Sequence, residues 1–137
     1  MQATSKLFFG VMGNPYESEL TTSLLRLVAE AVNEGHDVAV WTCGGATTIT
    51  RNALGEIKPR NVLDVLAGCS DRTYASTAAL VRSLVQRSNG RLQWYVCRHC
   101  AEERGALDQI AEARIQAPLR FAHHLEAATV PVIMGVK

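Results

Sequence analysis

The chain has 137 residues, which suits a single domain over residues 1–137 with a sizeable buried core. Apolar residues make up 47% of it, charged residues 20%, and the net charge is only +1 with acids and bases interspersed, so neither nucleic acid nor an anionic membrane is expected as the main partner. The apolar runs are far shorter than a membrane span, and the start lacks the apolar core of a signal peptide, so we expect a cytoplasmic protein.

The first third of the chain predicts a strand, a helix and a second strand. Residues 6–12 are a short apolar run that ends at Gly13-Asn14-Pro15, as a strand and its turn do. Apolar residues then recur every three or four positions, which predicts a helix with Ser18 as N-cap and Gly35 at its C-terminal end. Residues 36–43 are apolar enough for a strand covered on both faces, as in a parallel βαβ unit.

The middle of the chain predicts mainly helix. Residues 47–54, in the polar stretch after Gly44-Gly45, favour a helical turn or two, and residues 61–70 favour a short helix closed by Gly68. Residues 72–90 predict a longer helix that ends at Asn89-Gly90. Its inward-facing residues are expected to be Leu80, Val81, Leu84 and Val85.

The last third predicts strands separated by helical segments. The strand segments are residues 91–96, 130–136 and, as a short addition, 113–117. The helical segments are residues 99–104, 106–113 and 118–128, the last with Pro118 in its first turn. Alternation of this kind predicts an α/β fold in which a mostly parallel sheet of four to five strands carries helices on both faces.

The sequence Cys97-Arg98-His99-Cys100 lies where the third long strand ends and a helix begins. In open α/β sheets, ligands and chemistry gather beyond the carboxyl ends of the strands. Unpaired N–H groups at a helix start favour a thiolate, and Arg98 and His99 add positive charge nearby. We therefore expect Cys97 to be a nucleophile with a lowered pKa. The alternative is a buried cysteine that packs as a small apolar residue.

Cys100 has two interpretations at this stage. It is a second, resolving thiol in the manner of redox CxxC motifs, or it packs on a helical face shared with Arg104 and Leu107, provided that Gly105 does not break the helix. A metal site is the less favoured third interpretation, because one CxxC supplies two ligands and tetrahedral zinc needs four. No second CxxC or HxxxH pair accompanies it, so we expect neither metal nor cofactor.

The remaining cysteines and histidines carry weaker signals. Cys43 ends a strand before Gly44-Gly45, where the backbone can approach an anion, but no complete phosphate-loop pattern follows. We expect Cys43 to be buried near the site rather than catalytic, and Cys69 has no comparable context. For His123-His124 we expect one imidazole against the core and one at the surface.

The chain resembles the DsrE/DsrF-like family of sulfur-relay proteins, which includes TusD. The resemblance rests on "GNPYESE" after the first strand, "EGHDV" at residues 34–38, Cys97 followed by Arg104-Gly105, and residues 113–135. It implies a three-layer α/β fold, assembly into an oligomer, and a cysteine, here Cys97, that accepts sulfane sulfur as a persulfide and passes it on. Relatives tend to have small apolar residues where this chain has Arg98-His99-Cys100. This difference favours a role for Cys100 beside Cys97 in the thiol chemistry.

Three functional hypotheses follow from these residues. The leading one is a sulfur carrier or sulfurtransferase that holds a persulfide on Cys97, takes sulfur from protein or small-molecule donors, gives it to acceptors, and needs no cofactor. The second is a thiol–disulfide redox or redox-sensing protein that uses Cys97 and Cys100. The third is a subunit of a homo-oligomer whose thiols have no chemical role.

Overall fold

The computed structural model describes residues 5–16, 18–52 and 76–135. They form one five-stranded sheet of order β4-β3-β2-β1-β5, and all four strand pairings are parallel. The strands are β1 (Lys6–Met12), β2 (Asp37–Cys43), β3 (Leu92–Cys97), β4 (Ala113–Gln116) and β5 (Val130–Gly135). The predicted parallel α/β sheet is confirmed, and the short strand at 113–117 is its fifth member.

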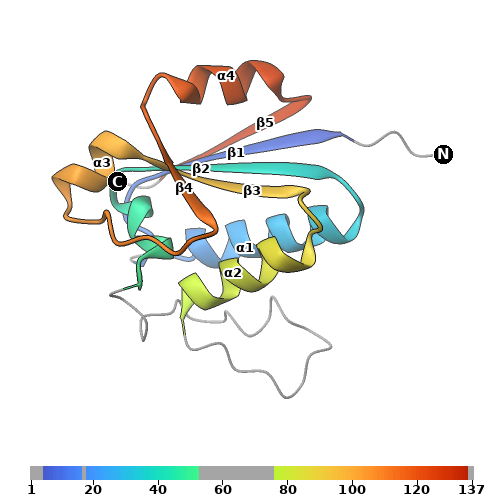
Figure 1. Ribbon diagram of the computed structural model, residues 1–137. Helices are drawn as coiled ribbons and strands as arrows, with labels where there is room; N and C mark the ends of the chain where they lie inside the picture. Colours follow the sequence, from blue (N-terminus) through green and yellow to red (C-terminus); the bar gives the residue numbers. More distant parts are fainter. Residues whose placement is uncertain (1–4, 17, 53–75, 136–137) are drawn as a thin grey trace.

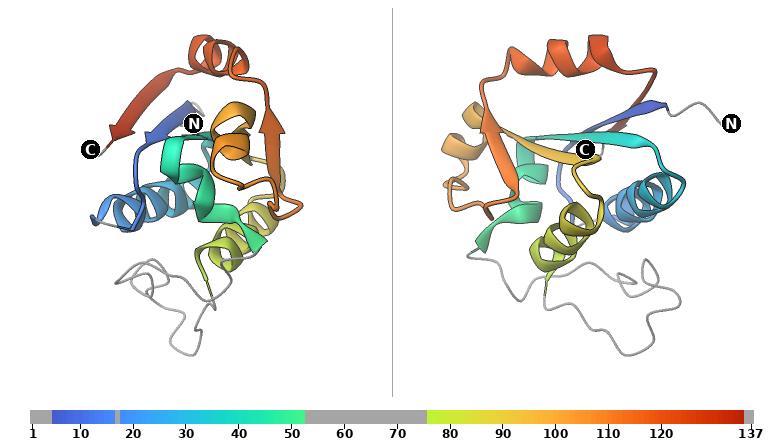
Figure 2. Two further views of the ribbon diagram at one scale, coloured as in Figure 1. Left: turned by 90° about the vertical axis from the view of Figure 1, so that its left-hand side faces the viewer. Right: turned by 45° about the vertical axis from the view of Figure 1, so that its right-hand side comes forward.

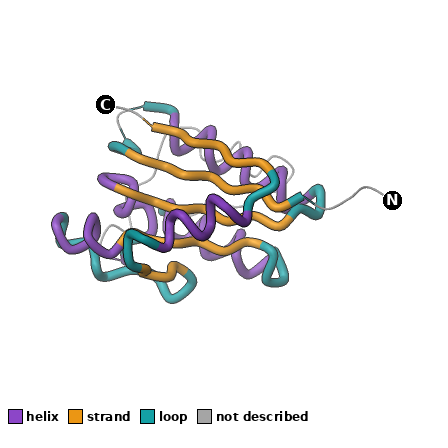
Figure 3. The backbone as a smooth tube through the Cα atoms, turned by 90° about the horizontal axis from the view of Figure 1, so that it is seen from above, coloured by secondary structure: helices purple, strands orange, loops and turns teal. Residues whose placement is uncertain are grey.

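Helices cover both faces of the sheet, so the described residues form three layers (Figures 1 and 2). The helices are α1 (Leu20–Asn33), the 3-10 helix η1 (Gly44–Thr50), α2 (Thr77–Arg87), α3 (Arg98–Glu103) and α4 (Arg120–Ala127). Helices α1 and α2 lie on one face, and α4 lies alone across the other, as Figure 3 shows from the α4 side. η1 and α3 follow β2 and β3 directly, at the carboxyl edge of the sheet.

The ends of the two long helices follow from local chemistry. The Ser76 hydroxyl accepts a hydrogen bond from the backbone N–H of Ala79 at 3.1 Å, so it caps α2, and Asn89 and Gly90 end the helix with φ of 54° and 84°. α1 ends before Gly35, whose φ is 87°. The predicted N-cap of α1 was wrong by one residue: Glu19 occupies that position with no side-chain cap, and Ser18 accepts from the N–H of Leu20 instead.

The core has two parts of unequal size. The larger part lies between the sheet and helices α1 and α2, and includes Leu80, Val81 and Leu84 as predicted, with Val85 only partly buried against it. The smaller part lies under α4 and is largely aromatic. Its buried members are Phe8, Ala39, Trp41, Tyr95 and Cys97. No residue of α4 is fully buried, so this helix covers its face of the sheet only partly.

Two predicted helical segments differ from the structure. Residues 106–113 do not form a helix, because Gly105, with φ of 60°, turns the chain at the end of α3. The segment instead runs beside the end of η1, where Asn52 N–H donates to Asp108 C=O at 2.8 Å and Ile110 N–H to Thr50 C=O at 3.0 Å. The turn expected at residues 47–54 begins earlier, at Gly44. The helix expected at 61–70, Gly68 and Cys69 lie outside the described residues.

None of the helices in the described part of the chain is long and apolar enough to cross a membrane.

Candidate functional site

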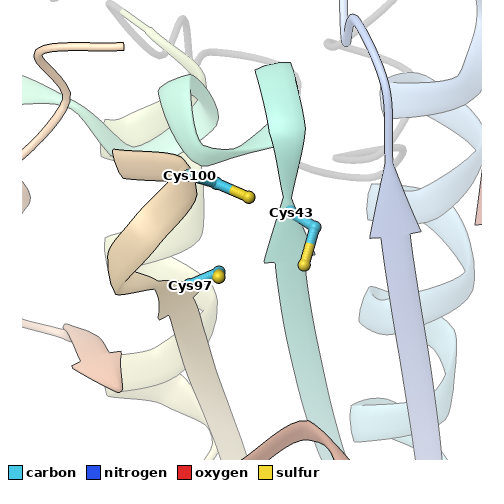
Figure 4. A group of neighbouring side chains, drawn as sticks. All are labelled: Cys43, Cys97 and Cys100. Atoms are coloured by element: carbon cyan, nitrogen blue, oxygen red, sulfur yellow. The ribbon is translucent and has the colours of Figure 1, made fainter. Parts of the chain in front are cut away.

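Three cysteines meet at the carboxyl edge of the sheet, and we refer to Cys43, Cys97 and Cys100 as the three-cysteine cluster. β2 and β3 are neighbours with pairing up to Thr42 opposite Val96, so Cys43 and Cys97 end adjacent strands side by side. Cys100 follows in the first turn of α3 and faces the same space (Figure 4). All three Sγ atoms lie within 4.8 Å of one another, and none of these cysteines forms a disulfide.

Cys97 is the buried member of the cluster, with 4% of its surface exposed. Burial raises the pKa of the Cys97 thiol, and the hydrogen bond from the backbone N–H of Cys100 lowers it by less. The lowered pKa expected from the sequence was therefore wrong in direction. The backbone donor anticipated at the helix start is present, but the loss of water around the sulfur has the larger effect.

Cys97 also touches both of the other thiols. Its Sγ lies within 4.8 Å of the Sγ atoms of Cys100 and Cys43, and both neighbours affect its pKa. The side chains of Cys43 and Cys100 are partly exposed. A sulfur atom bound to Cys97 therefore has two thiol neighbours that solvent can reach.

Cys43 is held by a tryptophan on its own strand. The Nε1–H of Trp41 donates a hydrogen bond to Cys43 Sγ at 2.9 Å. Burial raises the pKa of Cys43 to about 12, the Trp41 hydrogen bond lowers it, and the nearby sulfurs of Cys97 and Cys100 raise it. Cys43 is thus near the site, as predicted, but it is partly exposed rather than buried, and its sulfur is part of the cluster itself.

Arg98 and His99 take less part than the sequence indicated. Both side chains are exposed on α3. The shift in the pKa of Cys97 arises from burial and from its contacts with Cys100 and Cys43, not from these two residues. The residues that shape the electrostatics of the cluster are therefore the cysteines, the Trp41 indole and the start of α3.

An open cavity of about 570 Å³ lies beside the same edge of the sheet. Residues 13–16 after β1, Gly44-Gly45 and Thr48 of η1, and Arg104 line it. The backbones pack closely there, since a Cβ atom on Gly45 would lie 3.0 Å from the carbonyl oxygen of Gly13. Arg104 is the basic side chain of this cavity, and its Nη1 donates to the carbonyl oxygen of Cys100 at 3.4 Å and to the Glu103 carboxylate at 3.3 Å.

The histidines do not join the cluster among the described residues. His124 instead belongs to α4, where its ring stacks on Tyr95 of β3 with centroids 4.1 Å apart and its Nε2 is 2.8 Å from Gln116 Oε1. His123 is exposed, so the expected division into one inward and one outward imidazole is confirmed.

Sequence reasoning missed two features of the site. It placed Cys43 nearby but did not bring its sulfur into contact with Cys97, and it did not assign a role to Trp41. The first follows from the strand order and register, because Thr42 lies opposite Val96 and the next residues, Cys43 and Cys97, then lie side by side on strands about 5 Å apart. The second depends on a side-chain rotamer, for which the sequence has no signal.

Comparison with known proteins gives a fold and no family assignment. No protein-family model matches the chain, and no curated protein sequence matches it significantly. Among solved structures, the crystal structure of the ychN protein from E. coli is similar, with a TM-score of 0.69 and 18% sequence identity over 95% of this chain and 99% of that one. The likeness is one of fold, and it supports the three-layer α/β architecture that the resemblance implied.

Proposed function

We propose that the protein is a sulfur carrier or sulfurtransferase that holds sulfane sulfur as a persulfide on Cys97. The observation that carries the proposal is the three-cysteine cluster at the carboxyl edge of a DsrE-like sheet. Cys97 is its least exposed sulfur and touches both others. A persulfide there is shielded from water and oxidants, while its thiol neighbours stay within reach of partners.

The chemistry is a two-step exchange at one sulfur. The Cys97 thiolate attacks the outer sulfur of a donor persulfide R–S–SH, forming Cys97–S–SH and releasing R–S⁻. An acceptor thiolate then attacks the outer sulfur of Cys97–S–SH and regenerates the Cys97 thiolate. The backbone N–H of Cys100 stabilises the negative sulfur that appears in both steps. Because burial raises the pKa of Cys97, loading is expected to become faster as the pH rises above 7.

A second candidate function is thiol–disulfide exchange, which the direct contact between the Cys97 and Cys100 side chains favours. Oxidation would form one S–S bond, with loss of two protons and two electrons to a disulfide or persulfide oxidant. Cys43 is a further partner for Cys97 in the same chemistry, because their sulfurs also lie within 4.8 Å of each other.

Mass spectrometry of the intact protein and its peptides separates these functions. Reduced protein is incubated with thiosulfate, polysulfide or a persulfidated donor. One added sulfur on Cys97 supports the carrier, and loss of two hydrogens between Cys97 and Cys100 supports the redox protein. If no donor produces either change, both functions are contradicted. The hypothesis of an oligomeric subunit whose thiols have no chemical role then remains.

The assignment of the sulfur-bearing residue is tested with single variants. Cys97→Ser is expected to abolish loading, and Cys100→Ser and Cys43→Ser to retain it. Loss of loading in Cys100→Ser with retention in Cys97→Ser would reverse the two roles. Loss in both would mean that the pair acts as a dithiol, and the redox function would then be preferred.

A further inference from the structure

The three-cysteine cluster has the geometry of a metal site that the spacing of the cysteines in the sequence does not reveal. Two of its sulfurs come from a CxxC segment at the junction of β3 and α3, and the third comes from the end of β2. No histidine nitrogen or carboxylate oxygen of the described residues joins them within the same radius. The cluster therefore offers three soft ligands and no fourth.

The distances between the sulfurs fit one small ion at their centre. A thiolate bond to such an ion is roughly 2.3 Å long, and a metal in the plane of three such bonds places the sulfurs roughly 4 Å apart. In the structure all three sulfurs lie within 4.8 Å of one another. Side-chain adjustments of less than 1 Å close the site.

The ligand set also selects among metals. Soft thiolate ligands suit both zinc and copper(I). Structural zinc sites are almost always tetrahedral with four protein ligands, whereas copper(I) also accepts three thiolates, the number that this cluster offers. We propose that the three-cysteine cluster binds one copper(I) ion in three-coordinate thiolate geometry, in addition to its proposed role in sulfur transfer. Full coordination converts three thiols and one Cu⁺ into a Cu(SR)₃ centre of charge −2 and releases three protons.

The surroundings of the cluster suit such a centre. The Nε1–H of Trp41 points at Cys43 Sγ, and the backbone N–H of Cys100 at Cys97 Sγ, so two donors face the negative charge. The partial exposure of Cys43 and Cys100 leaves a path for the ion, while the burial of Cys97 keeps one ligand away from water. The same burial limits oxidation of the thiolates.

The test is an anaerobic titration of the reduced protein with copper(I) against a colorimetric copper(I) chelator. The parent carries Cys69→Ser, because Cys69 lies outside the described residues and must not supply sulfur. We expect one copper(I) per chain, a new thiolate-to-copper absorption in the ultraviolet, and at least tenfold weaker binding in each of Cys43→Ser, Cys97→Ser and Cys100→Ser. Arg98→Ala, which changes an exposed neighbour without removing a ligand, is expected to bind as the parent does.

Cys43→Ser is the decisive variant. If it binds copper(I) as tightly as the parent, the ion is held by the CxxC pair alone and the proposal is wrong. Retention of one zinc(II) but no copper(I) against matched chelators would also overturn it. X-ray absorption of the copper-loaded parent counts the sulfur ligands without any substitution in the site; three support the proposal and two refute it.

The copper proposal and the sulfur-transfer proposal fail separately. Cys43→Ser is expected to bind copper(I) at least tenfold more weakly while it still gains sulfur on Cys97. If the parent binds copper(I) through three sulfurs but does not load sulfur, the metal-site proposal is supported and the sulfur-transfer proposal is refuted.

Discussion

The indole Nε1–H of Trp41 donates to Sγ of Cys43 at 2.9 Å, from the same face of the same strand two residues away. Trp41 is fully buried and belongs to the aromatic core under α4. The hydrogen bond therefore joins the three-cysteine cluster to the interior packing of the sheet, and it lowers the pKa of Cys43 against the larger effect of burial.

Substitution of Trp41 by phenylalanine removes this donor and keeps an aromatic ring in the core. We expect the pKa of Cys43 to rise further, so alkylation of Cys43 slows at a given pH. The measurement is timed iodoacetamide labelling between pH 7 and pH 10, with peptides quantified by mass spectrometry. The smaller ring also opens space in the core, at a cost of about 1–2 kcal/mol of unfolding free energy.

Trp94→Phe is the matched control. Trp94 is equally buried on the neighbouring strand, but its Nε1 has no hydrogen-bond partner among the described residues. This substitution opens a similar space and removes a donor that bonds nothing, so it is expected to cost less stability and to leave Cys43 labelling unchanged. Equal labelling rates in the two variants would show that the Trp41 hydrogen bond does not affect the thiol.

The sequence predicted the sheet and its long helices because their patterns are local. Apolar runs at residues 6–12, 36–43 and 91–96 mark strands covered on both faces, and the glycines after α1 and α2 mark where the helices end. Residues 106–113 could not be predicted in the same way. Their apolar spacing fits a helix, yet Gly105 and contacts with η1, almost sixty residues earlier in the chain, decide their conformation.

The three-cysteine cluster could be predicted from the sequence only in part. Cys97 and Cys100 could be found because both lie at one strand–helix junction. The contact with Cys43 depends on which strand lies beside β3, a choice made by the whole fold. The pKa of Cys97 could not be predicted either, because the helix start acts through neighbouring residues, whereas burial depends on how the aromatic core under α4 packs.

Gln109 holds the non-helical segment in place. Its Nε2 donates to the carbonyl oxygens of Ala106 and Thr47 at 2.7 and 2.8 Å, and its Oε1 accepts from the Thr50 hydroxyl. Gln109→Ala leaves these partly buried groups without partners, so we expect a loss of roughly 1–3 kcal/mol of unfolding free energy in urea denaturation. Gln86→Ala is the control, because its bond to Glu112 is exposed and 3.3 Å long. Similar losses in both variants would contradict the assigned role.

His124 makes the packing of α4 sensitive to pH. Burial lowers the pKa of this imidazole below its ordinary value of 6.5, and the positive charges of Arg120, Lys6 and His123 lower it further. The folded state then binds fewer protons than the unfolded state as the pH falls through 6.5. Stability is therefore complete above pH 6.5 and decreases between 6.5 and the lower pKa of the folded state.

The check is urea unfolding at several pH values between 7.5 and 5. In His124→Phe the stacking partner of Tyr95 remains aromatic but cannot be protonated, so the stability of this variant is expected to fall less on acidification than that of the parent. His123→Gln removes an exposed neighbour and is expected to keep most of the pH dependence. A parent and a His124→Phe variant with the same pH profile would exclude His124 as the cause.

Self-association is the last prediction, and it concerns the outer edge of β5. This strand pairs only with β1 among the described residues, so its other edge is open, and Ile133 on it is 55% exposed. Val130, on the same strand, adds exposed apolar surface, and α4 leaves this face of the sheet partly uncovered. We expect a second copy of the chain to cover this edge, since such strands otherwise tend to aggregate.

Sedimentation at micromolar concentration should give a mass above the 14.9 kDa of the chain, and Ile133→Asp should return it to that value. Leu107→Asp, at a similarly exposed position between α3 and β4, should not change the mass. A parent protein that sediments at 14.9 kDa, or an oligomer that Ile133→Asp leaves intact, would rule out this edge as the interface.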